Sequence, residues 1–341
     1  MYNLLLVATL ALGSVAPALA YDWTVERLAD GVFAFLQPAE RRFDDANSVV
    51  IVGDDGLLLV DAQENPEAVR ALLAEIATRF DRPVRYLVNT HWHTDHVGGN
   101  GLVRAAFPDV TIVGHASLTT DVPGRGRETV QARLEQIDTV LPAAEEQLLT
   151  RVKRDGTQMT DEEVEAQRGA IERAKQWAAT HREMEFLPPT LTYEHLIRIQ
   201  IGARVIELHP HRGHTGGDTV LYLPQDRLLI TGDLLDALPY VGHGHPREWV
   251  QALDTLAELD FDTIVPGHGP VFHGRAQLTT VRGFLGTLID QVDAARAAGK
   301  TLEETTELID VSEWRARMAT DAASERFFDG VLGEAVGKIY E

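Results

Sequence analysis

The chain has 341 residues, 44% of them hydrophobic, so it can bury a sizeable core. Lys and Arg number 31 against 52 Asp and Glu, which gives a formal net charge of −21. That charge argues against binding to nucleic acid or to anionic lipid, because both need clustered positive charge. The chain has no cysteine, which excludes disulfides, thiolate zinc sites and a thiol nucleophile. Any metal must therefore be held by carboxylates and by some of the 13 histidines.

The first twenty residues have the pattern of a secretory signal peptide. An apolar run from Leu4 to Leu12 is too short to span a bilayer, which takes about 20 residues. It is followed by Ala18-Leu19-Ala20, a small-x-small pattern that signal peptidase accepts. We therefore expect cleavage after Ala20, a periplasmic or secreted location, and no membrane insertion of the mature chain.

Strand and helix patterns alternate through the first part of the mature chain. Apolar runs predict strands at residues 31–36, 48–52, 57–60, 84–88 and 110–113. A helical spacing of apolar residues predicts a helix over 65–80, with Pro66 near its start. This order of elements favours a layered α/β core.

Residues 116–190 interrupt this alternation. Apolar stripes predict one helix over 128–153 and a second that begins at Thr160, where Glu163 completes a capping box, and runs to about 181. Further strands and helices follow, the last of them close to the C-terminus. We expect one domain over 21–300, a helical insertion at about 116–190 and a C-terminal helical extension over 301–341.

A cluster of histidines follows the strand predicted at 84–88. The run His91-Trp92-His93-Thr94-Asp95-His96 offers three imidazoles and a carboxylate, which are the ligands that zinc takes when thiolate is absent. Three further residues, His214, Asp233 and His268, each follow a predicted strand, beside glycines that free the backbone. These side chains are expected to converge at one edge of the core.

This set of motifs resembles that of the metallo-β-lactamase superfamily. The resemblance implies an αββα sandwich, that is, two facing β-sheets with helices outside and metals at one edge. It also implies a first zinc on His91, His93 and His214, and a second on Asp95, His96 and His268. By the same resemblance, Asp233 is the bridging carboxylate and Asp61 orients the metal loop from beneath. A plain turn or capping role for Asp61 is the alternative.

Two metal ions held this way fit hydrolysis. A hydroxide between two Zn²⁺ ions could attack a carbonyl, with Asp95 orienting it and no nucleophilic side chain required. An Asp at 233, where thiol-containing β-lactamases have Cys, resembles the glyoxalase II and lactonase branches. We therefore expect an exported dinuclear zinc hydrolase of a small acyl substrate (an ester, thioester or lactone). Hydrolysis of β-lactams and a mononuclear iron dioxygenase of the persulfide type are the alternatives, and the ligands also accept Fe or Mn.

Other histidines are weaker candidates for contacts with substrate. His211 precedes the ligand His214, and His243 and His245 follow Asp233, so each could reach the substrate. The helical insertion lies between the metal loop and His214 in the sequence, which makes it a candidate lid. The sequence leaves the substrate and the oligomeric state open.

Overall fold

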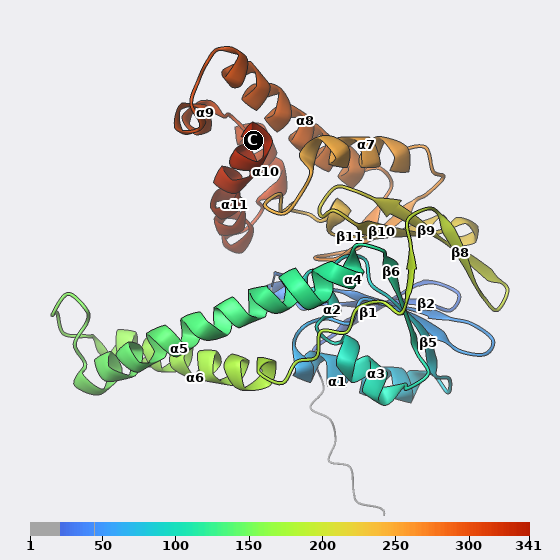
Figure 1. The fold of residues 1–341 in the computed structure, drawn as a ribbon, viewed down its shortest axis with the longest axis horizontal. Coiled ribbons are helices and arrows are strands. Elements are labelled where there is room, and N and C mark those ends of the chain that lie inside the picture. Colours follow the sequence, from blue (N-terminus) through green and yellow to red (C-terminus); the bar gives the residue numbers. More distant parts are fainter. Residues whose placement is uncertain (1–20, 44) are drawn as a thin grey trace, which may run out of the picture.

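Two β-sheets lie face to face at the centre of the structure, a computed structural model that describes residues 21–43 and 45–341 (Figure 1). In the first sheet seven strands follow chain order: β1 (Thr24–Ala29), β2 (Val32–Leu36), β3 (Ser48–Val52), β4 (Leu57–Val60), β5 (Val84–Val88), β6 (Thr111–His115) and β7 (Leu191–Tyr193). The second sheet has the order β13-β12-β11-β10-β9-β8. Its strands are β8 (Ile197–Ile201), β9 (Arg204–His211), β10 (Asp218–Leu223), β11 (Leu228–Gly232), β12 (Thr263–Pro266) and β13 (Phe272–His273).

Helices cover the outer face of each sheet. Against the first sheet lie α1 (Pro66–Arg79) and α3 (Asn100–Ala106), and against the second lie α7 (Pro246–Leu256), α8 (Ala276–Ala297) and α11 (Ala322–Tyr340). Outside the helical insertion, the remaining described helices are short: α2 (Thr94–Val97), α9 (Leu302–Leu308), α10 (Ser312–Met318), and the single turns η1 (Ala39–Arg41), η3 (Pro224–Asp226) and η4 (Asp233–Leu235). The order helix, sheet, sheet, helix is the αββα sandwich, so the predicted fold class is confirmed.

The strands that carry the site are buried on both faces. All four residues of β4 and all five of β11 are buried. This is expected where helices cover one face of a strand and a second sheet covers the other. The apolar layer between the sheets includes Ile51, Val88 and Ile230. In each sheet, parallel pairs (β4 with β5, and β11 with β12) point their carboxyl ends to the same edge.

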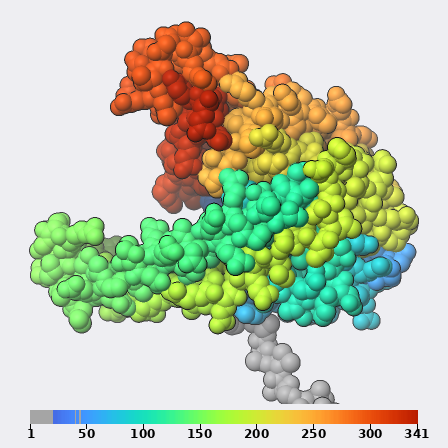
Figure 2. All heavy atoms as spheres, viewed as in Figure 1, coloured from blue at the N-terminus to red at the C-terminus, as the bar shows by residue number. Residues whose placement is uncertain are grey.

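The helical insertion forms a hairpin that projects from the body (Figures 1 and 2). A short helix α4 (Leu118–Asp121) continues through a wider π-helical turn (η2, Val122–Gly126) into α5 (Arg127–Thr150), and α6 (Asp161–His181) returns antiparallel to it. The capping box predicted between Thr160 and Glu163 is present. Helix α5 ends three residues earlier than predicted, because Arg151 takes a left-handed φ of 57° that a helix cannot continue.

The base of the hairpin packs on the metal loop, since Trp92 shares an apolar cluster with Val130, Leu134 and Ala178. The C-terminal helices share the core cluster of the second sheet, where Phe328 and Ile339 of α11 pack with Leu285 of α8. Within the described residues, no helix is both long and apolar enough to cross a membrane. The predicted signal peptide, residues 1–20, falls outside the described residues.

Candidate metal centre

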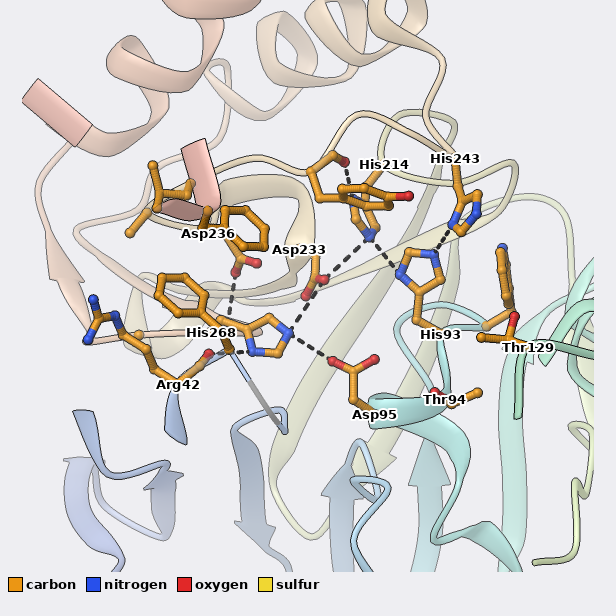
Figure 3. A pocket seen from close by; sticks show the side chains of 17 residues that line it. Arg42, His93, Thr94, Asp95, Thr129, His214, Asp233, Asp236, His243 and His268 are labelled. Atoms are coloured by element: carbon orange, nitrogen blue, oxygen red, sulfur yellow. Dashed lines mark hydrogen bonds and ion pairs between the residues drawn. The ribbon is translucent and has the colours of Figure 1, made fainter. Parts of the chain in front are cut away.

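The seven predicted ligands converge at the edge where strands of both sheets end. Figure 3 shows those that line the cavity, among them Asp95, Asp233 and His268. The run from His91 to His96 follows β5 of the first sheet. In the second sheet, His214 lies between β9 and β10, Asp233 follows β11, and His268 follows β12. The two sheets therefore each supply part of one site.

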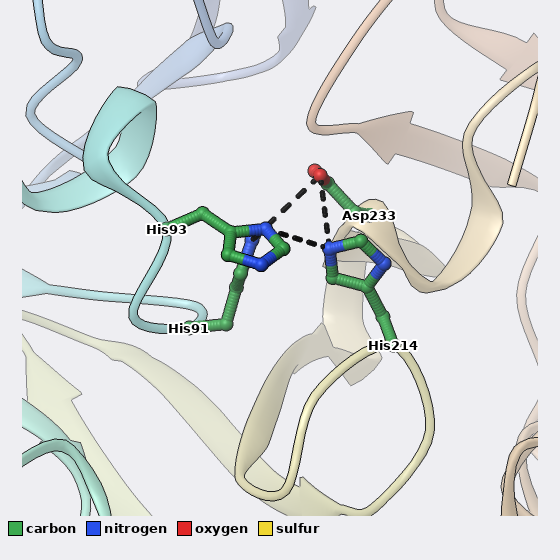
Figure 4. Close-up of side chains that lie close together, drawn as sticks. All are labelled: His91, His93, His214 and Asp233. Atoms are coloured by element: carbon green, nitrogen blue, oxygen red, sulfur yellow. Dashed lines mark hydrogen bonds and ion pairs between the residues drawn. The ribbon is translucent and has the colours of Figure 1, made fainter. Parts of the chain in front are cut away.

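One group of ligands consists of His91, His93, His214 and Asp233 (Figure 4). The Nδ1 atom of His93 lies 3.0 Å from the Nε2 atom of His91 and 3.0 Å from the Nε2 atom of His214. The Asp233 Oδ2 atom lies 3.3 Å from the His214 Nε2 atom and 3.7 Å from the His91 Nε2 atom. Four ligand atoms this close together form a candidate site for one ion.

A second group consists of Asp95, His96 and His268. The Asp95 Oδ2 atom lies 2.9 Å from His268 Nε2 and 3.4 Å from His96 Nε2. On its other side, Asp233 lies 3.1 Å from His96 Nε2 through Oδ1 and 3.6 Å from His268 Nε2 through Oδ2. Asp233 thus faces both groups, as a bridging carboxylate must.

The chemistry of the donors fits metal ions. His96 shares its Nδ1 proton with Asp61 at 2.7 Å, which leaves a lone pair on Nε2. The Nε2 atom of His96 and the Oδ1 atom of Asp233 are buried and make no hydrogen bond within the described residues, although they face each other. Two buried acceptors in contact need a cation between them, which is a metal ion when one is bound and otherwise the proton that Asp233, Asp95 and Asp61 favour by raising the pKa of His96 against the effect of burial. Gly267 leaves room for this arrangement, since a Cβ there would lie 2.0 Å from Asp233 Oδ1.

The other ring nitrogen of each histidine ligand has a partner that fixes the ring. His93 Nε2 lies 2.9 Å from His243 Nδ1, His214 Nδ1 lies 3.0 Å from the Tyr240 carbonyl, and His268 Nδ1 lies 2.8 Å from the Arg42 carbonyl. His91 Nδ1 lies 3.1 Å from the Thr90 hydroxyl. Such partners set the tautomer and hold the nitrogen of the ligand toward the ion.

The turn after β4 supports the metal loop from beneath. Asp61 accepts hydrogen bonds from the Thr90 amide at 2.8 Å and the Thr90 hydroxyl at 2.7 Å, besides its contact with His96. The turn is strained, because Asp61 and Gln63 have left-handed φ values of 56° and 62°. The structure therefore places Asp61 where the sequence reasoning expected it, in contact with the loop and not with the cavity.

Glu64, in the same turn, joins the metal loop to the insertion. Its Oε2 atom accepts a hydrogen bond from the Thr94 hydroxyl at 2.5 Å. Its Oε1 atom lies 2.9 Å from Nε2 of His181, a buried residue at the end of α6. The His181 ring stacks on Trp177. Sequence reasoning missed Glu64, because a single acidic residue in a turn carries no pattern.

The electrostatics differ between the two groups. Burial lowers the pKa of His91 and lowers that of His214 to about 4, so these imidazoles are neutral, the form that binds metal. Burial also opposes a charge on His268, but Asp233 and Asp95 outweigh it and raise its pKa to about 10. Burial opposes the charge of Asp233 too, yet the surrounding imidazoles hold its pKa well below the usual range. Without metal, the proton that His268 carries therefore supplies the positive charge between the carboxylates of Asp95 and Asp233 in the second group.

A cavity of about 260 Å³ opens beside the two groups. Its polar lining includes Asp95, Asp233, Asp236 and His243, and Thr129 of α5 also reaches it. Its apolar lining includes the following residues from separate parts of the chain: Phe43, Trp92, Leu238, Tyr240 and Phe327. Sequence reasoning missed Phe43, Asp236 and Phe327. Asp236 lies three residues after a predicted ligand, which was a usable signal, but the two phenylalanines gave none.

The three weaker histidine candidates lie in different places. His243 lines the cavity and contacts His93. His211 and His245 are not among the residues that line it. His211 is half-buried at the end of β9, where burial lowers its pKa to about 4, and His245 lies 3.1 Å from the Arg212 guanidinium. Contact of His211 or His245 with substrate stays a prediction, without support from the cavity.

Comparison with known proteins shows the family. A family model described as the metallo-β-lactamase superfamily matches residues 41–268, so the chain belongs to that superfamily, as the motifs predicted. A linear primary-alkylsulfatase from Pseudomonas sp. is 24% identical over 310 residues, which cover 86% of this chain and 54% of that protein. The chain therefore spans about half the length of this curated relative.

Two further similarities bear on the site and the fold. A hydroxyacylglutathione hydrolase from Thermosynechococcus vestitus is 40% identical over 65 residues, which cover 19% of this chain and 24% of that protein. The solved structure of a stereoselective inverting sec-alkylsulfatase from Pseudomonas sp. superimposes with a TM-score of 0.65 at 18% identity, covering 93% of this chain and 50% of that one. At that identity the structural match speaks for the fold alone.

Proposed function

We propose that the protein is a metal-dependent hydrolase that holds two divalent ions, zinc being the expected metal, and cleaves a carbonyl ester, thioester or lactone. The observation that carries this proposal is the pair of ligand groups that share Asp233 beside an open cavity. When bound, two ions at such a site supply a deprotonated water as nucleophile and polarise the carbonyl oxygen of the substrate.

Side chains that line the cavity can accept a proton and donate hydrogen bonds to the substrate. Asp95 is about a quarter exposed and lines the cavity, so its carboxylate can hold a proton released during attack. The Nδ1 atom of His243 accepts a hydrogen bond from the Nε2–H of His93. The Nε2 atom of His243 then carries the proton of that ring and can donate it in a hydrogen bond to a substrate oxygen. Tyr240 stays protonated, because burial and Glu334 raise its pKa to about 12. The Tyr240 hydroxyl is engaged by Glu334, so the His243 Nε2–H is the neutral donor that these two residues offer to the cavity.

Sulfate-ester hydrolysis is the second candidate. It is favoured by the similarity to an alkylsulfatase that extends over 86% of this chain. A sulfate ester is anionic before it reacts, whereas a carboxylic ester or a lactone is neutral. The charge of the preferred substrate therefore separates the two candidates.

The test uses the chain from Tyr21 onward, stripped with chelator and reloaded with zinc. We expect two zinc ions per chain by elemental analysis and turnover of 4-nitrophenyl acetate, a thioester or a lactone that the chelator stops. Turnover of 4-nitrophenyl sulfate alone would favour the second candidate, and fast turnover of a cephalosporin would favour a β-lactamase. His93→Ala should lose both metal and activity, whereas His195→Ala, at an exposed position, should keep both. An active protein without metal would contradict the proposal.

Export is part of this proposal and is supported by the sequence of residues 1–20. Expression of the full sequence in a bacterial host should yield a periplasmic protein whose N-terminal residue is Tyr21. Mass spectrometry of the intact chain measures this directly. A cytoplasmic protein that keeps Met1 would contradict export and leave the proposed chemistry unaffected.

A further inference from the structure

Two aromatic rings from distant parts of the chain form one wall of the cavity. Phe43 lies in the loop before β3, and Phe327 lies on α11, near the C-terminus. Their rings stack with centroids 4.9 Å apart and planes within 7° of parallel. Both rings line the cavity that contains the ligands Asp95 and Asp233. The C-terminal helix therefore contributes directly to the space beside the metal centre.

The cation at this wall is already neutralised. Arg42 is the one Lys or Arg among the residues that line the cavity. Its guanidinium donates to both carboxylate oxygens of Asp321, at 2.6 and 2.8 Å, and to the Ala39 carbonyl at 2.7 Å. It also lies over the Phe43 ring, 4.6 Å from the centroid. The Arg42 side chain is 19% exposed. Both hydrogen bonds to Asp321 come from Nη2, and Nη1 is held by the Ala39 carbonyl, so the paired guanidinium has little capacity left to bind an anionic group of a substrate.

We propose that the stacked rings of Phe43 and Phe327 form a subsite for an uncharged aryl or alkyl group of the substrate. The Arg42–Asp321 ion pair joins the two segments that carry these rings and keeps the wall neutral. This inference rests on the proposed function and narrows it, because it selects neutral esters over substrates that carry a charge away from the reacting bond. Helix α11 is then the element that determines specificity.

The position of the wall supports this assignment. The backbone carbonyl of Arg42 accepts the Nδ1 proton of His268, so the loop that carries Phe43 is fixed to a ligand of the metal centre. An apolar group held on the rings would therefore lie at a constant distance from the reacting bond. Leu238, which follows η4, adds to the apolar lining of the same cavity. Apolar binding that orients the reacting bond favours the chemical step.

Binding of two fluorescent probes tests the subsite without relying on turnover. 2-Naphthol is neutral, and 6-hydroxy-2-naphthoate adds one carboxylate to the same ring system. Isothermal titration calorimetry on the chelator-treated protein, in which no metal ion competes for the carboxylate, should show the neutral probe binding about tenfold more tightly, because the wall offers apolar area and its one cation is paired. Equal or reversed affinities would overturn the claim that the wall selects neutral groups.

Two variants connect this preference to the residues. Phe327→Ala should weaken 2-naphthol about tenfold, which is about 1.4 kcal/mol, while Leu308→Ala, at an exposed position on α9, should change nothing. Asp321→Asn keeps an oxygen to cap α11 but removes the charge that neutralises Arg42. It should therefore raise affinity for the anionic probe about fivefold, since a charged hydrogen bond becomes available. Unchanged probe affinity in Asp321→Asn would overturn the role of the ion pair even if Phe327→Ala failed to fold.

Kinetics separates the failure of this inference from that of the proposed function. Phe327→Ala should raise KM for 2-naphthyl acetate about tenfold and change KM for methyl acetate less than about twofold. Equal changes for both esters would refute the subsite and leave the hydrolase intact. Probe binding that depends on Phe327, in a zinc-loaded protein that hydrolyses neither these esters nor a thioester or lactone, would refute the proposed reaction and retain the subsite.

Discussion

Replacement of Asp61 by Asn tests how far the metal centre depends on the turn beneath it. Asp61 is 2% exposed and accepts three hydrogen bonds, from the amide and hydroxyl of Thr90 and from Nδ1 of His96. Asn tolerates the left-handed φ of 56° at this position, so the backbone conformation can persist. One of the two side-chain oxygens becomes an amide nitrogen, a donor that faces donors.

The magnitude follows from these contacts. The variant loses at least one hydrogen bond to a carboxylate, and such a bond contributes about 1.5–3 kcal/mol. His96 is then no longer held with its Nε2 lone pair toward Asp233, so part of this loss is expected in metal affinity. Removal of a partner of this type lowers metal affinity about 10- to 100-fold. We therefore expect the dissociation constant for the more weakly bound zinc to rise by that factor.

Competition against a chromophoric chelator measures this affinity. Asp109→Asn, at an exposed position before β6, serves as the matched control and should bind zinc as the unaltered protein does. Chemical denaturation of both variants without metal separates loss of fold from loss of affinity. If Asp61→Asn binds both ions with unaltered affinity, the proposed orientation of His96 by Asp61 is wrong.

Three further predictions follow from other contacts. Gly267→Ala should bind less metal in equilibrium dialysis, because the added Cβ would clash with the Asp233 carboxylate. Gly286→Ala, where an added Cβ meets no atom within 4 Å, is the control and should keep its metal. Full metal binding by Gly267→Ala would contradict the close contact between Gly267 and Asp233. Glu64→Ala should lower the free energy of unfolding, measured by urea denaturation, by about 1–3 kcal/mol, because Thr94 and the buried His181 lose their partner. An unchanged free energy of unfolding would argue against the connection that Glu64 makes between the metal loop and the insertion. Burial lowers the His211 pKa to about 4, so protonation of this side chain should contribute a loss of at most about 3 kcal/mol to the stability of the chelator-treated protein as pH falls from 6.5 to 4, in addition to the losses from other buried histidines such as His214. His211→Asn should flatten that part of the stability curve, and an identical slope in both proteins would refute it.

The ligands could be predicted from sequence because each is a residue type with few alternative roles, placed at the end of a strand. His91 comes shortly after the strand run Val84–Val88, and His268 lies between two glycines after the run Thr263–Val265. Parallel strands bring their carboxyl ends to one edge, so position along the chain indicated position in space. The alternation of strands and helices predicted a layered α/β core, and the αββα order of the layers came from the resemblance to the superfamily.

The walls of the cavity could not be predicted, because they depend on how distant segments meet. Phe43 and Phe327 are separated by most of the chain, and neither lies in a motif. The contact of His93 with His243 could not be predicted for the same reason. The sequence indicated His243 only as one of several possible substrate contacts, and its spacing gave no reason to prefer it to His245. Helix ends were accurate where local chemistry sets them, as at Thr160, and less so where the backbone conformation of one residue, Arg151, decides.

The division of the ligands between the two sheets ties folding to the supply of metal. Residues 91–96 come from one half of the sandwich, and His214, Asp233 and His268 come from the other, so neither half alone offers a complete set for two ions. If ions bind as proposed, each would be coordinated by residues of both sheets and would hold the sheets together. Ions present at a thousand times their dissociation constant would add about 4 kcal/mol per site to the free energy of unfolding. A chain that crosses a membrane unfolded and meets zinc on the far side would thus gain its full stability at its destination.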